Sequence, residues 1–505
     1  MEKDKKWDIR PMFNAYPDSI GGKLAGAAEL LGRPEFQDTF GSFYILPSLF
    51  HSDLDRGFSV IDYGINEELA AREDLEALKK LGISLKLDFI LNHASVQSPQ
   101  FRDLLENGEE SVYKDFFIDW NLFWENHGTM TSEGYIEPDA ELIREMFFRK
   151  PGLPILMVEF PDGKKVPYWN TFYQKVWEEG GKTRYLGQMD LNEKSDMVWK
   201  FYEDTLDRLQ SYGAGIVRLD AFAYLSKEVG KRNFLNEPET WEILWKLRRM
   251  ADERNLQLLP EIHASYEEKK YSMLAEQGYM IYDFFLPGLI IDALENHSGV
   301  YLKAWAEEII ERKLRTVNML GCHDGIPMLD LRGILSEERI QALMDRIVER
   351  GGYIKNLHGN KKMYYQVNAT YYSALGEDDK KLLLARALQL FMPGRPQVWY
   401  LDLFAGKNDH EAVKRAGADG HKEINRTNLN AEQIESALQK DVVKKQLELL
   451  QFRSRCDVFA SDSEIEISCE NEKIFITWKR AGKSVCLKAD LRTCDYEITE
   501  HDGQS

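Results

Sequence analysis

The sequence predicts an α/β protein: a (β/α)8 TIM barrel with inserted subdomains and a small C-terminal antiparallel β domain. Short apolar segments alternate with helical patterns over most of the 505 residues, and several of these segments end in ionisable residues. From residue 456 onward the pattern changes to alternating polar and apolar residues, as in EIEIS and KIFITWKR. Strands that alternate with helices are typical of a parallel sheet, whereas strict alternation is typical of an antiparallel one.

Six segments have the length and composition of buried strands: residues 43–46, 84–90, 215–219, 257–260, 316–320 and 397–400. Polar groups closely follow four of them, namely Asn92 and His93, Asp220, Glu261 and His263, and His323 and Asp324. In a closed barrel the carboxyl ends of all strands lie on one face, so we expect these groups to share one pocket. A single carboxylate could simply cap the next helix, but repetition at four strand ends favours a functional site.

The barrel pattern is interrupted twice along the chain. We expect the barrel to comprise residues 1–92, 193–324 with the candidate catalytic groups, and 377–455; residues 93–192 to form an inserted domain; 325–376 a second inserted subdomain; and 456–505 the C-terminal β domain. The first insert contains Trp120, Trp124, Trp169 and Trp177. Because indoles bury large areas wherever they can, these residues favour a packed subdomain over a platform for sugars.

The charge and the amino terminus exclude several classes of protein. A formal net charge of −19 and a pI near 5.2 argue against nucleic acid or anionic lipid as a partner. The first residues, MEKDKKWDIR, lack the apolar core of a signal peptide, and no later stretch is apolar enough for a membrane span. We therefore expect a cytoplasmic protein with no membrane partner. Five cysteines without C-x-x-C spacing suggest neither a disulfide framework nor a zinc site.

The segment GIVRLDAFAY supplies a candidate nucleophile. Arg218 and Asp220 are two residues apart, so on a strand they point to the same side. The guanidinium would keep the carboxylate ionised and oriented. Cleavage of a glycosidic bond needs a second carboxyl group across the bond from the first.

Two further motifs supply that second carboxyl group and a third one. In LLPEIHASY, Glu261 and His263 have the same spacing as Arg218 and Asp220, and the apolar approach through residues 258–260 would help raise the pKa of the glutamate. GCHDG adds His323 and Asp324 as a hydrogen-bonding pair.

The set LKLDFILNH, GIVRLDAFAY, LLPEIH and NMLGCHDG, in this order and spacing, resembles the four signature regions of the α-amylase superfamily (glycoside hydrolase family 13). Further segments resemble its sucrose phosphorylase-like branch over nearly the full chain: ILPSLF, DRGFSVIDY, FFRKPGLP, YDFFLP, YYQVNATYYSALG, PGRPQVWYLDLFAGKND and EINR. Each motif is weak alone, but together they are specific.

The resemblance implies a role for each matching residue. Asp220 would be the nucleophile, Glu261 the general acid/base and Asp324 a third carboxylate that binds glucosyl hydroxyls. The terminal glucose would be enclosed by Asp55, Phe58, His93, Phe172, Arg218, His323 and Arg426. Tyr224, His263, Tyr365, Gln366 and again Arg426 would surround the phosphate. Because phosphate is already an anion, it needs donors to hold it rather than a strong base.

The acceptor side departs from the pattern of the branch. Where sucrose phosphorylases typically present a leucine and an aspartate to fructose, this chain has Lys362 and Met363. Lys362, with Lys361 and the neighbouring Lys355, would suit an anionic acceptor such as a sugar phosphate; a solvated loop face would explain the same lysines without a function.

A second departure lies on the first insert. Lys150 stands where many relatives carry an arginine, and the adjacent Arg149 could partly substitute for it. The stretch YQKVWEEGGKTRYLGQMDLN, directly after Phe172, is longer than its counterpart in the branch and would reshape the acceptor side.

We expect no cofactor and no metal ion. Asn92 matches a residue that binds structural calcium in many amylases, but the phosphorylase-like branch does without this ion. The GGKTR run is similar to part of a phosphate-binding loop, yet Val176 stands where that motif requires glycine.

The resulting expectation is a retaining glycoside phosphorylase that transfers an α-glucosyl unit from sucrose, or a related small α-glucoside, to inorganic phosphate. Relatives in the branch act on sucrose phosphate, glucosylglycerol or glucosylglycerate, and all three stay open as substrates. Two different functions also stay open, namely a retaining α-glucosidase or transglucosidase and a non-catalytic amylase-like binding subunit. The sequence does not fix the oligomeric state.

Overall fold

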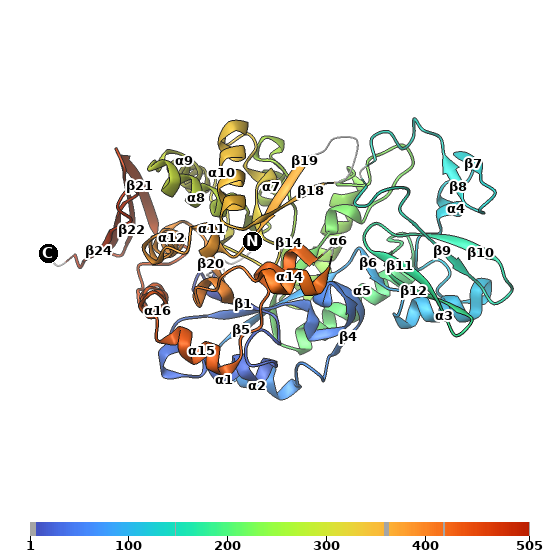
Figure 1. Ribbon diagram of the computed structural model, residues 1–505, viewed down its shortest axis with the longest axis horizontal. Coiled ribbons are helices and arrows are strands. Elements are labelled where there is room, and N and C mark those ends of the chain that lie inside the picture. Colours follow the sequence, from blue (N-terminus) through green and yellow to red (C-terminus); the bar gives the residue numbers. More distant parts are fainter. Residues whose placement is uncertain (1–6, 147, 358–362, 418–419, 504–505) are drawn as a thin grey trace.

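The computed structural model describes residues 7–146, 148–357, 363–417 and 420–503. Its centre is a sheet of eight parallel strands in the order β14–β13–β5–β2–β1–β20–β16–β15, so strands that follow one another around the sheet also follow one another in the chain (Figure 1). These strands are β1 (Met12–Ala15), β2 (Ser42–Ile45), β5 (Ser84–Ile90), β13 (Ala214–Asp220), β14 (Gln257–Pro260), β15 (Ile281–Asp283), β16 (Thr316–Met319) and β20 (Arg395–Trp399). The predicted barrel class is confirmed.

Helices cover the outside of this sheet. Apart from α3 and α10, which are given below with the inserts, the described helices longer than six residues are α1 (Leu24–Leu31), α2 (Arg72–Lys80), α5 (Asp196–Ser211), α6 (Glu239–Glu253), α7 (Lys270–Glu276), α8 (Leu286–Asn296), α9 (Val300–Glu311), α12 (Asp379–Phe391), α14 (His410–Ala416), α15 (Ala431–Leu438) and α16 (Asp441–Arg455). Side chains fix several of their starts: the Ser195 hydroxyl accepts from the Met197 amide before α5, and Asp378 accepts from two amides of α12. No described helix combines the length and apolarity that crossing a bilayer would require.

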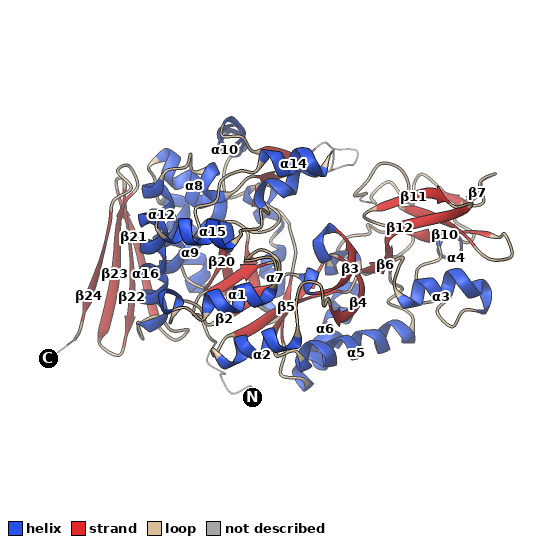
Figure 2. Cartoon of the chain, turned by 60° about the horizontal axis from the view of Figure 1, so that its bottom comes forward, coloured by secondary structure: helices blue, strands red, loops and turns tan. Residues whose placement is uncertain are grey.

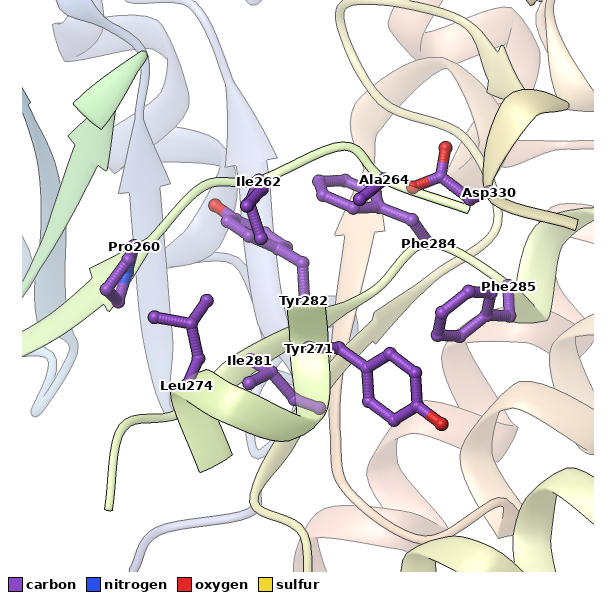
Figure 3. A pocket seen from close by; sticks show the side chains of 10 residues that line it. All are labelled: Pro260, Ile262, Ala264, Tyr271, Leu274, Ile281, Tyr282, Phe284, Phe285 and Asp330. Atoms are coloured by element: carbon purple, nitrogen blue, oxygen red, sulfur yellow. The ribbon is translucent and has the colours of Figure 1, made fainter. Parts of the chain in front are cut away.

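The two ends of the strand order, β14 and β15, meet without a ladder of backbone hydrogen bonds in the described part of the chain. Pro260 at the end of β14 has no amide proton to donate, and β15 has only 3 residues. Apolar side chains from both strands and from α7 fill the seam and line a small pocket there, among them Leu274, Ile281 and Tyr282 (Figure 3). The barrel is therefore closed by packing at this point.

Most of the first insert lies at one end of the longest axis (Figures 1 and 2). It contains β6 (His93–Ser95), α3 (Pro99–Asn107), α4 (Trp120–Phe123), β7 (Gly128–Met130), β8 (Ile136–Pro138), β9 (Ile155–Glu159), β10 (Lys165–Trp169), β11 (Gln174–Glu179) and β12 (Lys182–Asp190). Trp120, Trp124 and Trp169 are fully buried in a separate apolar cluster, as expected for a packed subdomain, whereas Trp177 on β11 is partly exposed.

Shorter elements build the rim of the barrel. The antiparallel pair β3 (Phe50–Leu54) and β4 (Ser59–Ile65) follows β2. After β16 the chain forms β17 (Ile326–Pro327), α10 (Glu337–Glu349), β18 (Tyr353–Leu357), β19 (Met363–Asn368) and α11 (Tyr371–Ala374), and after β20 it forms α13 (Tyr400–Leu403). β19 pairs with both β17 and β18, which places this small sheet beside the carboxyl end of β16.

Four antiparallel strands form the C-terminal sheet at the opposite end of the molecule (Figure 2). They are β21 (Glu464–Glu470), β22 (Lys473–Arg480), β23 (Lys483–Asp490) and β24 (Tyr496–His501). Alternate residues of β22 and β23, such as Ile476 and Leu487, are buried against the barrel core. The predicted C-terminal antiparallel domain is confirmed, and the boundaries proposed for all the domains stay predictions.

Candidate active site

Arg218 lies at the centre of three carboxylates at the strand ends. Its Nη1 is 2.9 Å from Asp220 Oδ1 and 2.5 Å from Asp88 Oδ1, and its Nη2 is 2.8 Å from Glu261 Oε1. β13 carries both Arg218 and Asp220, and the register pairs Arg218 with Asp88 on β5. The predicted same-side placement of Arg218 and Asp220 is therefore observed, and one guanidinium fixes both candidate catalytic carboxylates.

The protonation of this pair differs from the sequence-based expectation. Burial raises the pKa of Asp220 well above its usual range, and the charges of Glu261 and Asp88 add to the effect, while Arg218 opposes it. The pKa of Glu261 is lowered: burial opposes its ionisation, but Arg218 and His263 outweigh burial. As expected, burial acts to raise the pKa of Glu261, but the guanidinium that reaches across to the glutamate reverses the net shift. The expectation that Arg218 keeps Asp220 ionised is not met, because burial outweighs the guanidinium.

Backbone strain directly follows Asp220. Ala221 has φ 50° and ψ 26°, a left-handed conformation that residues other than glycine adopt at a cost, and its amide lies 3.4 Å from Glu261 Oε2. The turn therefore brings a backbone donor to the second carboxylate and starts the 3-10 turn that carries Tyr224.

Asp324 is held by cations at the carboxyl end of β16. Lys422 Nζ is 2.6 Å from Asp324 Oδ1, and Arg426 Nη2 is 4.0 Å from the same atom. Burial opposes ionisation of Asp324, but the His323 ring, Lys422 and Arg426 hold its pKa well below its usual range. Burial lowers the pKa of His323 to about 3, so the imidazole is neutral, and its Nε2 lies 3.2 Å from Asp324 Oδ2.

Asp55 faces Asp324 across these cations. Its Oδ1 is 3.2 Å from Arg426 Nη1, and its Oδ2 is 3.7 Å from Lys422 Nζ. Gly57 permits this loop, since its φ is +114° and a Cβ there would lie 2.1 Å from the Ser48 amide nitrogen. Arg426 thus belongs to the Asp55 side of the site, and its described contacts do not include the residues expected around the phosphate.

Aromatic rings form a continuous wall beside the carboxylates. Phe58 stacks on His323 at 5.0 Å between centroids, and its carbonyl accepts from His93 Nε2 at 2.9 Å. The His93 ring lies 5.0 Å from Phe172, which lies 5.4 Å from Tyr224. The structure brings together all the residues predicted to enclose the glucose, and rings are suited to the apolar faces of a sugar.

Arg149, and not Lys150, faces this wall. The Arg149 guanidinium lies over Tyr365 at 5.3 Å and over both Phe172 and Tyr224 at 5.8 Å. Lys150 Nζ instead contacts the Asn170 side chain, and burial lowers its pKa to about 8. The sequence expectation for Lys150 as an acceptor-site residue is therefore not supported by its contacts.

The remaining residues predicted for the acceptor side lie near Asp324 and Glu261. Gln366 Nε2 donates to the Asp324 carbonyl at 2.6 Å, and His263 packs against Tyr365 with ring centroids 5.2 Å apart. Lys355 is opposite Gln366 in the β18–β19 ladder. Lys361 and Lys362 lie outside the described residues, so their predicted role stays a prediction.

A lysine ammonium occupies the polar site at Asn92. Lys227 Nζ lies 2.8 Å from Asp190 Oδ2, 3.3 Å from Asn92 Oδ1 and 2.7 Å from the Tyr224 carbonyl. The Asp190 carboxylate also accepts from the Thr171 amide and hydroxyl, both at 2.7 Å. Within the part of the chain that the structure describes, no three histidine, cysteine, aspartate or glutamate side chains are grouped so that they could hold a metal ion.

Sequence reasoning missed several residues of this site. Lys422 follows no strand and sits in a short 3-10 turn, so no periodicity marks it. Asp88 could have been found, because it lies four residues before Asn92 inside the first signature region. It is two residues from Lys86 on β5, so both side chains point to the same face of the strand. Lys86 is buried between Tyr282 and Gln397, with Nζ 2.6 Å from Gln397 Oε1.

Asp220, Glu261 and Asp324 lie together at the carboxyl ends of the strands of a parallel barrel. This arrangement is typical of (β/α)8 enzymes, whose active sites lie at this face. The model of the α-amylase catalytic domain matches residues 39–324. The chain belongs to the α-amylase family, in its sucrose phosphorylase-like branch.

The relatives are similar over their full length. The sequence is 54% identical over 506 positions to a sucrose 6(F)-phosphate phosphorylase of Ilumatobacter coccineus, covering 98% of this chain and 97% of the relative. It is 34% identical to a sucrose phosphorylase of Streptococcus mutans, with 98% of each chain covered. The crystal structure of a sucrose 6F-phosphate phosphorylase from Thermoanaerobacter thermosaccharolyticum superimposes with a TM-score of 0.89 at 34% identity, covering 99% of this chain and 97% of that one.

Proposed function

We propose that the protein is a retaining phosphorylase that transfers the glucosyl unit of sucrose 6F-phosphate to inorganic phosphate. The products would be α-glucose 1-phosphate and fructose 6-phosphate. The names of two relatives support this choice of donor over sucrose, glucosylglycerol and glucosylglycerate. The observation that carries it is a group of cations, Arg149, Lys355 and Lys422, beside the catalytic carboxylates.

These cations match the charge of the proposed substrates. The donor, the leaving group and the phosphate are all anions that must enter the same pocket, and charge-assisted hydrogen bonds are the strong way to hold phosphate oxygens. The proximity of Lys422, followed by burial and Arg149, lowers the pKa of Lys355 to about 7. A bound phosphate would relieve this repulsion among cations, so the pocket favours a substrate more negative than sucrose itself.

In the first half-reaction, Asp220 attacks the anomeric carbon, and Glu261 donates its proton to the oxygen that leaves with fructose 6-phosphate. The result is a β-glucosyl ester of Asp220. In retaining enzymes the two catalytic carboxyl groups are only about 5 to 5.5 Å apart. The contact of both Asp220 and Glu261 with the Arg218 guanidinium is consistent with such a short separation. In the second half-reaction an oxygen of hydrogen phosphate attacks the same carbon from the opposite side, the ester bond to Asp220 breaks, and the proton of the phosphate returns to Glu261. The α configuration and the starting enzyme are thereby restored.

The proton must move within the carboxylate pair before reaction. Burial favours a proton on Asp220, whereas the mechanism needs it on Glu261. The pair shares Arg218 and titrates as a unit. Positive charge that develops at the anomeric carbon favours ionised Asp220, and the proton then belongs on Glu261.

The binding of glucose would come from the remaining groups. Asp324 and Asp55 would accept hydrogen bonds from sugar hydroxyls, with Arg426, His323 and His93 as donors. Tyr224, Tyr365 and Gln366 would line the acceptor side. A cytoplasmic location stays a prediction.

The test is to incubate the purified protein with sucrose 6F-phosphate, sucrose, glucosylglycerol and glucosylglycerate, each with and without inorganic phosphate. We expect phosphate-dependent α-glucose 1-phosphate, with sucrose 6F-phosphate giving the highest kcat/KM. A higher kcat/KM for uncharged sucrose would overturn the choice of donor. Free glucose at a rate independent of phosphate would identify a hydrolase instead.

A further inference from the structure

A buried carboxylate to which the mechanism gives no role, Asp330, lies behind His263. Its Oδ2 is 3.2 Å from His263 Nδ1, and Asp330 is 2% exposed. The other ring nitrogen, Nε2, is 3.7 Å from Glu261 Oε1. The imidazole therefore connects a carboxylate outside the catalytic group to the proposed general acid/base.

The surroundings of the ring leave it one orientation. Phe284 stacks on His263 at 3.9 Å between centroids and 23° between planes, and Tyr365 meets it nearly edge-on. Asp330 belongs to the 3-10 turn Leu329–Leu331, and its carboxyl group lies beside Ala264 and Phe284 at one end of the pocket along the β14–β15 seam (Figure 3). With Nδ1–H donating to Asp330, Nε2 is directed into the active site.

The charge on this ring follows from the groups that face it. Burial opposes protonation of His263, but Asp330, by charge and by hydrogen bond, and then Glu261 and Asp324 outweigh burial and raise its pKa above 6.5. The cations nearby are Arg218, which binds Glu261, and Arg149, which lies over Tyr365. The excess of carboxylates thus favours the protonated form of the ring.

We propose that Asp330 is a positioning residue that fixes the orientation and the positive charge of His263, so that His263 binds inorganic phosphate in the second half-reaction. This inference rests on the proposed phosphorylase function, since only an anionic acceptor needs a cation at this place. A raised pKa means that the charge is present at low pH and is lost as the pH rises through that pKa. Affinity for phosphate should therefore fall on the alkaline side, earlier when Asp330 is neutral.

A titration without substrate tests the first half of the proposal. The protein is labelled with ¹³C at histidine Cε1, and the His263 signal is identified as the one lost in His263→Gln. We expect the wild-type signal to titrate above pH 6.5 and that of Asp330→Asn to titrate lower by about one pH unit or more. A wild-type titration below pH 6.5 overturns the proposal, whether or not Asp330→Asn is stable.

Kinetics test the second half. At pH 7.5 we expect Asp330→Asn to lower kcat/KM for phosphate at least about tenfold, with the deficit shrinking as the pH falls toward the lowered pKa of His263 in the variant. The same substitution in a His263→Gln background should have no further effect. A deficit that does not change with pH, or one that persists in the His263→Gln background, shows a merely structural role. If neither protein uses phosphate, the proposed function fails, while the titration still reports on Asp330.

Discussion

Arg218 donates hydrogen bonds to Asp88 and Asp220 and forms an ion pair with Glu261, and sharing the guanidinium among three carboxylates matters more than any one contact. Asp88 also accepts from the Tyr44 hydroxyl at 2.9 Å, so the guanidinium is anchored from below while its other edge serves the two catalytic carboxylates. Removing a partner from a buried charge group leaves the rest unpaired, which costs several kcal/mol. The active site is therefore one electrostatic unit in which single residues cannot be exchanged independently.

The assignment of Glu261 as proton donor is tested with a leaving group that needs no proton. Glu261→Gln should lower phosphorolysis of sucrose 6F-phosphate by about 100- to 10,000-fold, the usual contribution of general acid catalysis. With α-glucosyl fluoride, whose fluoride leaves unprotonated, the loss should be less than about tenfold. Asp220→Asn is the control, since it should lose activity on both donors. Equal loss of both activities in Glu261→Gln would contradict the role.

Arg149 and Lys150 form a matched pair for testing the acceptor side. Arg149→Gln should raise KM for sucrose 6F-phosphate by about 10- to 100-fold, because a charge-assisted hydrogen bond contributes about 1.5 to 3 kcal/mol. Lys150→Gln, which loses its contact to Asn170, should change this KM less than about threefold. Steady-state rates at varied concentrations of sucrose 6F-phosphate give this KM for both variants. A larger change in KM in Lys150→Gln than in Arg149→Gln would contradict the assignment of Arg149 to the acceptor side.

At the scale of elements, the sequence predicted the strands and strand ends better than the loops. Six of the eight barrel strands stand out by apolar composition, whereas β1 and β15 do not: β1 has the polar Asn14 among its 4 residues, and β15 has only 3 residues, the last of them Asp283. Asp220, Glu261 and Asp324 could be predicted because strand ends are defined by local pattern. Lys422 and Asp330 could not, because their neighbours in space are determined by how distant loops pack onto the barrel.

Lys227 joins three of these elements. Its ammonium binds Asp190 at the end of β12, Asn92 after β5 and the carbonyl of Tyr224 in the turn after β13. Because the Lys227 and Asp190 side chains are 1% and 0% exposed, water does not weaken the pair. A protein cation thus holds the first insert against the barrel at Asn92, the residue that matches a calcium ligand of many amylases.

Lys227→Met should lower the free energy of unfolding by about 3 to 5 kcal/mol, since it leaves Asp190 buried and unpaired. The exposed pair Lys194–Glu228 is the control, and Lys194→Met should cost less than about 1 kcal/mol. Thermal unfolding measures both, and a chelator should leave the wild-type midpoint unchanged. A Lys227→Met midpoint equal to that of the wild type, or a wild-type midpoint lowered by the chelator, would sink this account.

At the scale of the whole molecule, one apolar core extends from the barrel into both the C-terminal sheet and much of the first insert. Buried residues of β22 and β23, such as Ile476 and Leu487, belong to the same cluster as the barrel interior. In the first insert Phe101, Phe117 and Tyr168 also belong to this core, whereas Trp120, Trp124 and Trp169 belong to a second, smaller cluster. We therefore expect the C-terminal sheet to unfold together with the barrel.

Trp478 is the residue that tests this continuity. It is 2% exposed, its Nε1 donates to the Phe391 carbonyl at the end of α12 at 2.7 Å, and it packs against Phe459 and under Arg453. Trp478→Ala should cost about 3 to 5 kcal/mol through lost burial and the cavity left behind. Trp245→Ala, at a side chain that is 46% exposed, should cost less than about 1 kcal/mol. In urea, far-UV circular dichroism and catalytic activity should both shift to lower concentration in Trp478→Ala by the same amount, because loss of the sheet also unfolds the distant active site. Activity that survives to the wild-type concentration while the circular dichroism falls in an earlier step would mean that the C-terminal sheet unfolds alone.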